Sequence, residues 1–274
     1  MNRRQEVAGG VKVRTLPVQV AAQLVHRIAD GGLSDGRAPS ELEISQEFGV
    51  SRVVARETLK ILASLDIVEI AQGRRVTIRP LEEWDYLNPL LAEWLPEEHV
   101  DTLLRELHET RVLLEPELAA MAAVSITDAA LARLGQALDR MTDLEVDPDG
   151  YLEADLEFHM EICRAGNNRI LERIMYSARW LLTASRRVTN AATEDLHVAT
   201  AAHTQIHEAL TARDPEAARA AMREHLQGNV PILAENEQRT RRRSARSTTH
   251  RPSTTSRPST AGQPSNAGQP SAAN

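Results

Sequence analysis

Four side chains in the second half of the sequence have the types and spacing of a divalent metal site. Asp155 and His159 are four residues apart, so on a helix both project from one face. His203 and His225 lie 11 residues before and 11 residues after Asp214, which is a good helix cap. If two helices fold back at Asp214 as an antiparallel hairpin, these imidazoles come level with each other. Three histidines and one carboxylate suit Zn²⁺, or else Ni²⁺, Mn²⁺ or another divalent ion, with positions left for water or a ligand carboxylate.

Spacing alone leaves other interpretations of these residues open. A single histidine on a helix is usually an ordinary core or surface residue, and the chain has nine histidines. Those outside the pattern are His26, His99, His108, His197, His207 and His250. An open metal could also activate water in a metalloenzyme, although no further carboxylate–histidine pair offers an obvious general base. A third possibility is a metal sensor, in which the ion itself is the signal.

A second stretch, residues 39–65, has the pattern of a DNA-reading unit. Ser40 and Glu43 have the spacing of a capping box at the start of a short helix. Gly49 can adopt the left-handed conformation in the turn that follows, and Ser51 can cap the next helix. The sequence therefore predicts two helices joined by a tight turn.

The second of these helices has one basic face. Arg52, Arg56 and Lys60 recur every four residues, while Ala55 and Leu59 lie on the opposite side at core spacing. A buried back and a basic front, presented by a preceding helix, are typical of a helix-turn-helix that reads DNA. The alternative is an ordinary amphipathic helix whose basic residues only face solvent.

A small β-hairpin is predicted directly after this unit. Residues 66–70 and 75–78 alternate or are β-branched, and the segment between them contains Gly73. A helix, a helix-turn-helix and a hairpin together make a winged helix. Arg74 and Arg75, near the tip of the wing, could contact phosphates or enter the minor groove. They could equally serve only to keep the hairpin soluble.

The remaining sequence predicts a mainly α protein. Aromatic residues are only 3% of the chain, so its core must be built from aliphatic side chains. Beyond residue 98 five breaks and no strand-like run predict an all-α bundle of six to seven helices. A short helix is expected over Pro89–Leu95, with Trp84 and Trp94 packed between the domains. We expect a flexible leader (1–14), a winged helix-turn-helix domain (15–80), a linker (81–97), an all-helical domain (98–238) and a disordered basic Ser/Thr/Pro-rich tail (239–274).

Charge is distributed unevenly along the chain, whose net charge is −7. Residues 1–80 have 12 Lys and Arg against 9 Asp and Glu, residues 81–238 have a net charge of −17, and residues 239–274 have 7 Arg and no acid. DNA would meet the N-terminal domain and be repelled by the body. The single cysteine, Cys163, excludes an intramolecular disulfide and a cysteine-based zinc site. With no signal peptide and no membrane span in the sequence, we expect a cytoplasmic protein.

Residues 39–62 and the glycine wing after them resemble the DNA-binding domain of the GntR family of bacterial transcription regulators. The family motif is matched at Pro39, Ser40, Glu41, Glu43, Gly49, Val50, Ser51, Arg52, Arg56, Glu57 and Leu59. Leu42 stands where many members have a DNA-contacting arginine, and Arg75 where the wing usually has a second glycine. The resemblance implies a homodimer on double-stranded, pseudo-palindromic operator DNA. The predicted DNA-binding residues are Ser40, Glu41, Ser51, Arg52, Arg56, Lys60, Gly73, Arg74 and Arg75.

The body resembles the FCD ligand-binding domain that follows this head in the FadR-type subfamily. The pattern of that domain is Asp-x-x-x-His, then a histidine, then another after about 22 residues, and the chain fills it with Asp155, His159, His203 and His225. The resemblance implies a bound divalent metal and a small carboxylate effector that pairs with an arginine. Arg111 matches the family's arginine on the first long helix, and Arg179 and Arg187 are further candidates. The alternative for Arg111 is a helix-surface pair with Glu115.

Together these resemblances imply a ligand-responsive transcription regulator and not an enzyme. The usual expectation for the family is a repressor of a catabolic operon that is released by its ligand. The tryptophan-rich linker is similar to that of regulators of sugar-acid catabolism, so we expect a sugar acid or hydroxy acid as effector. The alternatives are a metal-sensing regulator and a metalloenzyme that uses the three-histidine, one-aspartate site.

Overall fold

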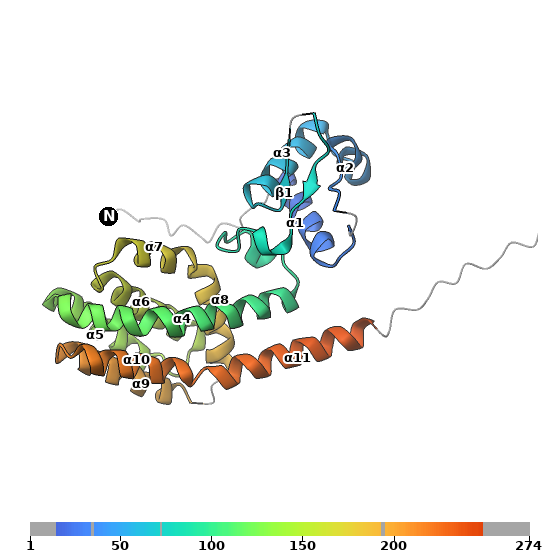
Figure 1. The fold of residues 1–274 in the computed structure, drawn as a ribbon. Coiled ribbons are helices and arrows are strands. Elements are labelled where there is room, and N and C mark those ends of the chain that lie inside the picture. The colour runs from blue at the N-terminus through green and yellow to red at the C-terminus, as the bar shows by residue number, and fades with distance from the viewer. Residues whose placement is uncertain (1–14, 34–35, 72, 193–194, 249–274) are drawn as a thin grey trace, which may run out of the picture.

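The computed structural model describes residues 15–33, 36–71, 73–192 and 195–248 (Figure 1). The predicted leader, residues 1–14, and the part of the predicted tail from residue 249 onward lie outside the described residues. A helical head with a small hairpin is followed by a larger, all-helical body. The predicted class, a mainly α chain with a winged helix before a helical domain, is confirmed.

The head is a three-helix unit with a wing. It comprises α1 (Leu16–Ala29), α2 (Glu41–Phe48), α3 (Arg52–Ser64), β1 (Val68–Glu69) and β2 (Thr77–Ile78). The caps are those that the sequence predicted. The hydroxyl of Ser40 accepts from the amide of Glu43, whose carboxylate accepts from the amide of Ser40. Gly49 ends α2 with φ +63°, and the hydroxyl of Ser51 accepts from the amide of Val54 at the start of α3.

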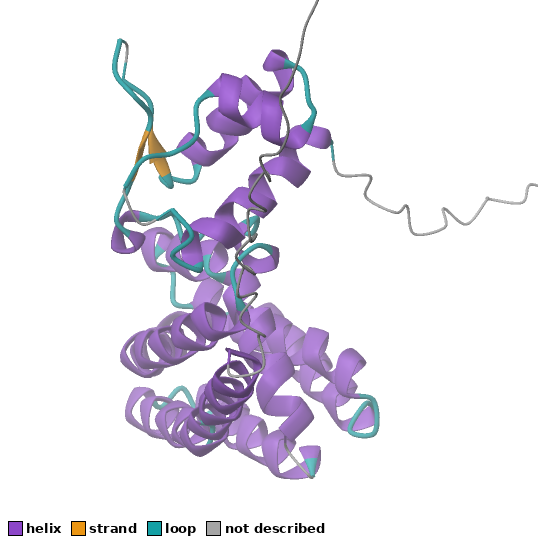
Figure 2. Cartoon of the chain, turned by 90° about the vertical axis from the view of Figure 1, so that its right-hand side faces the viewer, coloured by secondary structure: helices purple, strands orange, loops and turns teal. Residues whose placement is uncertain are grey.

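The wing is a short antiparallel hairpin that stands along one side of the head, with its loop pointing away from the body (Figure 2). Val68 pairs with Ile78, and Glu69 with Thr77. A bridge between Arg37 and Thr77 ties the segment before α2 to the outer edge of β2. Each strand is shorter than the run predicted for it, since only two residues of each run form ladder pairs with the other strand.

The linker folds onto the head. It contains two single-turn 3-10 helices, η1 (Leu81–Glu83) and η2 (Leu91–Glu93). Trp84 and Trp94 are buried in the core of the head, against which Val100 and Leu103 of the following helix also pack. The tryptophans therefore pack where the two domains meet, as predicted. The helix expected over Pro89–Leu95 is only a single 3-10 turn, because the prolines on either side leave too few residues for an α-helix.

The body is built around one long helix. Its helices are α4 (Glu97–Ser125), α5 (Asp128–Asp143), α6 (Pro148–Ala165), α7 (Arg169–Ser177), α8 (Arg179–Ala192), α9 (Leu196–Thr211), α10 (Pro215–Gln227) and α11 (Val230–Thr248). The central helix α4 contacts α6, α8, α9, α10 and α11. The five helix breaks predicted from the sequence did not include two that the structure shows. Ala178 separates α7 from α8 without a glycine or proline, and Gly228 separates α10 from α11.

The last helix continues ten residues beyond the predicted start of the tail. In α11 the side chains of Asn236 and Thr240 hydrogen-bond Asp101 near the start of α4, the first of them at 2.8 Å. Because this contact docks the helix on the body, α11 persists to Thr248 although its composition predicted disorder. Within the described part of the chain, no helix combines the length and the apolar character that a membrane span requires.

Candidate functional site

The recognition helix α3 presents the basic face that its sequence predicted. Arg52, Arg56 and Lys60 are exposed, while Ala55 and Leu59 are buried against the rest of the head. The N-terminal end of such a helix is the part that contacts base edges in a major groove. The structure therefore leaves the predicted reading surface open to a duplex.

One of these arginines is held in place by the preceding helix. The guanidinium of Arg56 donates from Nε and Nη2 to the two carboxylate oxygens of Glu41, at 2.9 and 3.1 Å. This hydrogen bond from Arg56 lowers the pKa of Glu41 below its ordinary value, against the opposing effect of burial. Glu41 and Ser40 were both predicted to contact DNA. In the structure Glu41 orients Arg56, and the hydroxyl of Ser40 caps α2.

The tip of the wing carries the two predicted arginines. Gly73 has φ +72°, a conformation that a residue with a Cβ adopts only under strain. Arg74 and Arg75 follow it and are exposed. The turn at Gly73 therefore presents two positive charges in the loop of the hairpin, which points away from the acidic body (Figure 2).

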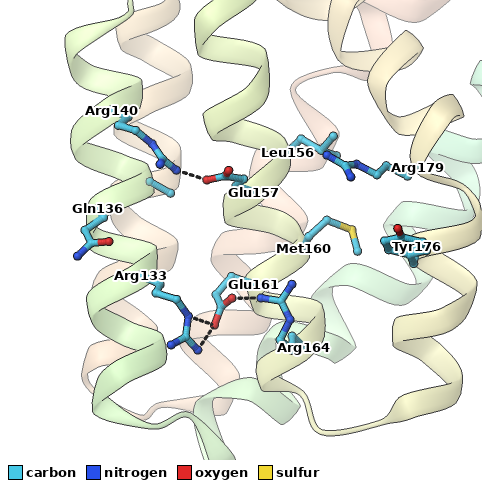
Figure 3. A pocket seen from close by; sticks show the side chains of 11 residues that line it. Arg133, Gln136, Arg140, Leu156, Glu157, Met160, Glu161, Arg164, Tyr176 and Arg179 are labelled. Atoms are coloured by element: carbon cyan, nitrogen blue, oxygen red, sulfur yellow. Dashed lines mark hydrogen bonds and ion pairs between the residues drawn. The ribbon is translucent and has the colours of Figure 1, made fainter. Parts of the chain in front are cut away.

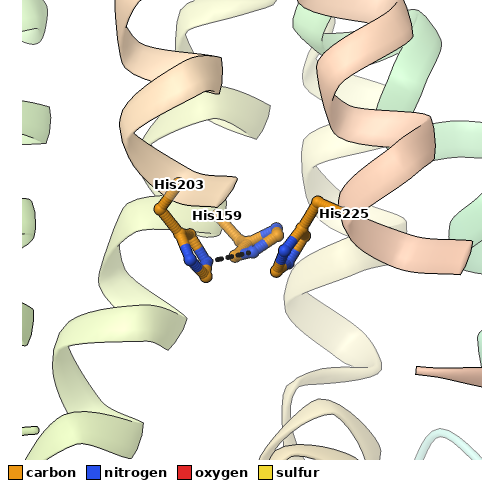
Figure 4. A group of neighbouring side chains, drawn as sticks. All are labelled: His159, His203 and His225. Atoms are coloured by element: carbon orange, nitrogen blue, oxygen red, sulfur yellow. Dashed lines mark hydrogen bonds between the residues drawn. The ribbon is translucent and has the colours of Figure 1, made fainter. Parts of the chain in front are cut away.

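In the body, three imidazoles from three different helices face one another (Figure 4). They are His159 on α6, His203 on α9 and His225 on α10, and their ligand atoms all lie within 4.8 Å of one another. The ring centroids of His203 and His225 are 4.2 Å apart, so the α9–α10 hairpin brings them level, as the spacing predicted. The Nε2 atoms of His159 and His203 are 3.1 Å apart.

Asp155 completes the predicted set. Its Oδ1 lies 3.0 Å from Nε2 of His203 and 3.4 Å from Nε2 of His159. All of these groups except the partly buried His225 are enclosed by protein. The four predicted ligand residues therefore converge on one buried point.

The outer nitrogens of two of the histidines are fixed by hydrogen bonds. Nδ1 of His203 donates to the backbone carbonyl of Ala199 at 2.7 Å, and Nδ1 of His159 donates to Glu115 at 2.6 Å. Since a carbonyl oxygen can only accept, Nδ1 of His203 carries a proton, and in the neutral form of the ring its Nε2 is therefore a lone pair. A hydrogen bond of this kind, donated by the ring nitrogen that does not bind the metal, orients a metal-ligating histidine.

Glu115 is in turn bound by Arg111, whose Nε donates to it at 2.6 Å. Both belong to α4 and are almost fully buried, with exposed side-chain fractions of 1% and 2%. The pairing of Arg111 with Glu115 was the alternative that the sequence offered, but it occurs in the core and not on a helix surface. Arg111 thus acts through Glu115 on the orientation of His159.

The electrostatics of the site keep its acids ionised and the imidazoles of His159 and His225 neutral. Burial opposes ionisation of Glu115 and Asp155, but the guanidiniums of Arg111 and Arg186 and the adjacent histidines hold the pKa of both carboxyls well below the usual range. Burial, together with Arg186, lowers the pKa of His159 to about 4. Burial and the neighbouring histidines also place the pKa of His225 well below its ordinary value.

A buried arginine that the sequence did not single out touches this site. Nε of Arg186, on α8, lies 2.5 Å from Oδ2 of Asp155, while its Nη1 and Nη2 have no hydrogen-bond partner among the described residues. The helical periodicity of the sequence contained a signal that Arg186 is buried. Arg186 shares a face with the buried Leu182 and Asn190, whereas the predicted Arg187 is turned outward.

The other two predicted effector-binding arginines lie on the surface. Arg187 is exposed on α8 and lines a surface hollow with Glu235 and Arg239 of α11. Arg179 lines a separate surface cavity of about 440 Å³ (Figure 3). Its neighbours there include the ion pairs of Arg140 with Glu157 and of Arg133 and Arg164 with Glu161. The structure therefore does not bring Arg179 or Arg187 to the histidine cluster.

A winged helix with an open basic recognition face, joined to a helical domain with a buried polar site, defines a DNA-binding transcription regulator. Residues 16–78 match the model of bacterial regulatory proteins of the gntR family, and residues 106–228 match the FCD domain. The chain belongs to the GntR family, with an FCD domain as its body. Members of this family are transcription regulators, so the prediction that the chain is not an enzyme is confirmed.

Known proteins resemble this chain over different spans. The HTH-type transcriptional regulator LutR of Bacillus subtilis is 30% identical, over 76% of this chain and 96% of LutR. The galactonate operon transcriptional repressor of Escherichia coli is also 30% identical, over 50% of this chain and 60% of that repressor. A solved structure of Lar, which controls expression of the Listeria monocytogenes agr system, superposes with a TM-score of 0.54 at 19% identity, covering 82% of this chain and 99% of that one. This last likeness concerns the fold alone.

Proposed function

We propose that the chain is a cytoplasmic, homodimeric repressor of a catabolic operon, released from its operator when a small carboxylate binds at a metal site in the body. The operator is double-stranded DNA read by the two α3 helices. The effector is a sugar acid or hydroxy acid, in line with the similarity to a protein named as the repressor of a galactonate operon.

The observation that carries the metal site is the meeting of acceptors at one buried point. The Nε2 lone pairs of His159 and His203 face each other at 3.1 Å, with the ionised Asp155 beside both. Without a cation, the lone pairs of the two neutral rings and the carboxylate repel one another. A divalent ion held by Asp155, His159, His203 and His225 attracts all of these groups and offers a position for a ligand oxygen. Zn²⁺ matches the nitrogen-rich donor set best.

Charge balance supports an anionic effector. Asp155 and Glu115 carry two negative charges, Arg111 and Arg186 carry two positive charges, and His159 and His225 are neutral. The charges of these six residues therefore sum to zero before a divalent ion adds two positive charges, which are costly to bury uncompensated. A carboxylate offsets them, and the unpartnered Nη1 and Nη2 of Arg186 can bind it bidentately. We therefore assign the effector-binding role to Arg186, with Arg111 acting through Glu115.

Helix α8 offers a route from this site to the head. At its middle Arg186 contacts Asp155, and near its start the indole of Trp180 donates to the backbone carbonyl of Tyr86 in the linker, at 3.1 Å. An effector that draws Arg186 away from Asp155 would shift α8 and the linker with it. Release follows only if the effector binds the two positions of α8 with different affinity.

The test is a thermal-shift screen of sugar acids, hydroxy acids and dicarboxylates on protein loaded with Zn²⁺, Ni²⁺ or Mn²⁺. We expect at least one acid to raise the unfolding midpoint only in the metal-loaded protein and to release it from a DNA duplex selected by its own binding. His203→Ala should abolish both responses and lower the bound metal per chain. Unchanged metal stoichiometry in His203→Ala, or no released complex with any acid, contradicts the proposal.

A metal sensor is the second candidate, because Asp155 and the three histidines can fill a tetrahedral shell without any effector. The two proposals differ in one measurement, the DNA affinity as a function of free metal with no acid present. If metal alone changes this affinity tenfold or more, the ion is the signal. If the affinity changes only when an acid is added to metal-loaded protein, the acid is the signal.

A further inference from the structure

The DNA-reading face of α3 contains an exposed apolar side chain among its charges. Val53 is the second residue of the helix, and 70% of its surface is open to solvent. Of its two neighbours in the sequence, Arg52 is exposed and Val54 is partly buried. A β-branched apolar residue left this open at the start of a recognition helix is costly to hydrate, and Val53 is not among the described residues that pack in or against the core of the head.

Helical geometry places Val53 on the same face as the basic residues. At about 100° per residue, its direction differs from that of Arg56 by about 60° and from that of Lys60 by about 20°. Residues at the N-terminal end of a recognition helix are those that reach base edges. When α3 lies in a major groove, Val53 therefore faces the bases together with Arg56, which is held by its bidentate bond to Glu41.

The major groove offers one apolar group to such a side chain, the 5-methyl group of thymine. We propose that Val53 is a specificity-determining residue that selects thymine in each half-site by packing its methyl groups against that 5-methyl group. The flanking cations bind phosphate or guanine and hold the helix in the groove, and Val53 distinguishes thymine from cytosine and from uracil. This inference rests on DNA binding by the head and is independent of the proposed metal and effector.

A second exposed apolar residue in the head provides a matched control. Leu16, the first residue of α1, is 49% exposed. It lies outside the helix-turn-helix formed by α2 and α3 and is not among the predicted DNA-binding residues. Leu16→Ser therefore removes a comparable exposed apolar side chain of the head without changing the helix-turn-helix.

The experiment begins with the full-length protein and a duplex enriched from a random-sequence library by its binding. Each thymine of the enriched site is then replaced by deoxyuridine, which removes only the 5-methyl group. In the wild-type protein we expect one position in each half-site at which this replacement weakens binding about fourfold, the effect of one buried methyl group. In Val53→Ser the penalty at that position should fall below about 1.5-fold, and in Val53→Thr, which keeps one γ-methyl group, it should lie between the two.

Two outcomes overturn the assignment. One is a uracil scan without any penalty in the wild-type protein, and the other is a penalty of the same size in Val53→Ser. The penalty must persist in Leu16→Ser, since loss of an apolar surface residue in general would otherwise explain the result. Both side chains are exposed, so equal unfolding midpoints of the three variants and the wild type show that the fold is retained. Failure of the library to enrich any sequence would instead count against DNA binding itself.

Discussion

The head and the body place their charged side chains in opposite environments. On the head, Arg52, Arg56 and Lys60 face solvent, and only Arg56 is bound to a residue of another helix. In the body, Asp155, Glu115, Arg111 and Arg186 are almost completely buried and are paired in a closed network around the histidines.

This difference predicts how each region responds to substitution. An exposed charge costs little to leave unpaired, so its removal changes DNA binding and hardly affects folding. A buried charge whose partner is removed retains its full desolvation cost, so its removal destabilises the fold. The head therefore separates function from stability, and the body couples them.

The largest effect that tests this comparison is expected for Arg186→Gln. The substitution leaves Asp155 buried without its guanidinium, and the free energy of unfolding of metal-free protein should fall by about 3–5 kcal/mol. Denaturant unfolding followed by circular dichroism measures it. Zn²⁺ should restore part of the loss, because the ion replaces the missing positive charge beside Asp155.

Arg187→Gln is the matched control, since it removes the same charge from the next residue of α8 where the side chain is exposed. We expect its unfolding free energy to stay within about 0.5 kcal/mol of the wild-type value. Equal losses in the two variants would mean that burial of Arg186 has no energetic consequence, and the contrast between head and body would fail.

The same contrast explains what could be predicted from the sequence. Ser40, Glu43 and Gly49 act on residues within a few positions of themselves, so the caps and the turn of the helix-turn-helix were correct in detail. Asp155 and His159 were found because they are four residues apart on one helix, and His203 and His225 because the α9–α10 hairpin is symmetric about Asp214. Glu115 and Arg186 were not assigned to the site, because α4 and α8 reach it only through the packing of the bundle, which no local spacing encodes.

The next effect in size is expected on the recognition helix. Arg52→Ala or Arg56→Ala should weaken binding to the selected duplex by about 10- to 100-fold, the effect of one lost base contact. The unfolding midpoint should remain at the wild-type value, because both side chains are exposed. Fluorescence anisotropy with a labelled duplex and thermal unfolding of the same samples provide the two measurements.

For this prediction Arg27→Ala is the control, because Arg27 forms an ion pair with Glu47 within the head and lies off α3. Its DNA affinity should be unaltered within about twofold. If Arg56→Ala bound DNA as tightly as Arg27→Ala does, α3 would not be the reading helix in the way proposed here.

A smaller effect is expected where the two regions meet. Trp180→Phe removes the hydrogen bond to the carbonyl of Tyr86, which is worth about 0.5–1.5 kcal/mol, and part of the ring packing, while it keeps an aromatic side chain at this position. DNA affinity without effector and effector affinity without DNA should both stay near the wild-type values. The ratio of DNA affinities with and without effector should fall by about two- to tenfold, because α8 then no longer moves the linker.

Trp84→Phe tests whether the position of the lost hydrogen bond determines the effect on the ratio of DNA affinities. It removes a comparable indole hydrogen bond, to the carbonyl of Arg79 at 3.2 Å, but this bond joins the linker to the wing and not to α8. The ratio of DNA affinities should be unchanged in this variant. An unchanged ratio in Trp180→Phe as well would exclude α8 as the connection between effector and head.

The smallest effect concerns the wing, whose two arginines after Gly73 are exposed. Arg74→Gln and Arg75→Gln should each lower the steepness with which DNA affinity falls as salt rises, by about one unit of log–log slope per lost phosphate contact. The loss should be alike for all sequences if the arginines touch phosphates, and confined to A·T-rich flanks if they enter the minor groove. Arg79→Gln, at the base of the same hairpin and paired with Asp66 and Glu83, should leave the slope as it is. A slope that changes equally in all three variants would show that the wing acts only through its net charge, and that the turn at Gly73 does not aim its arginines.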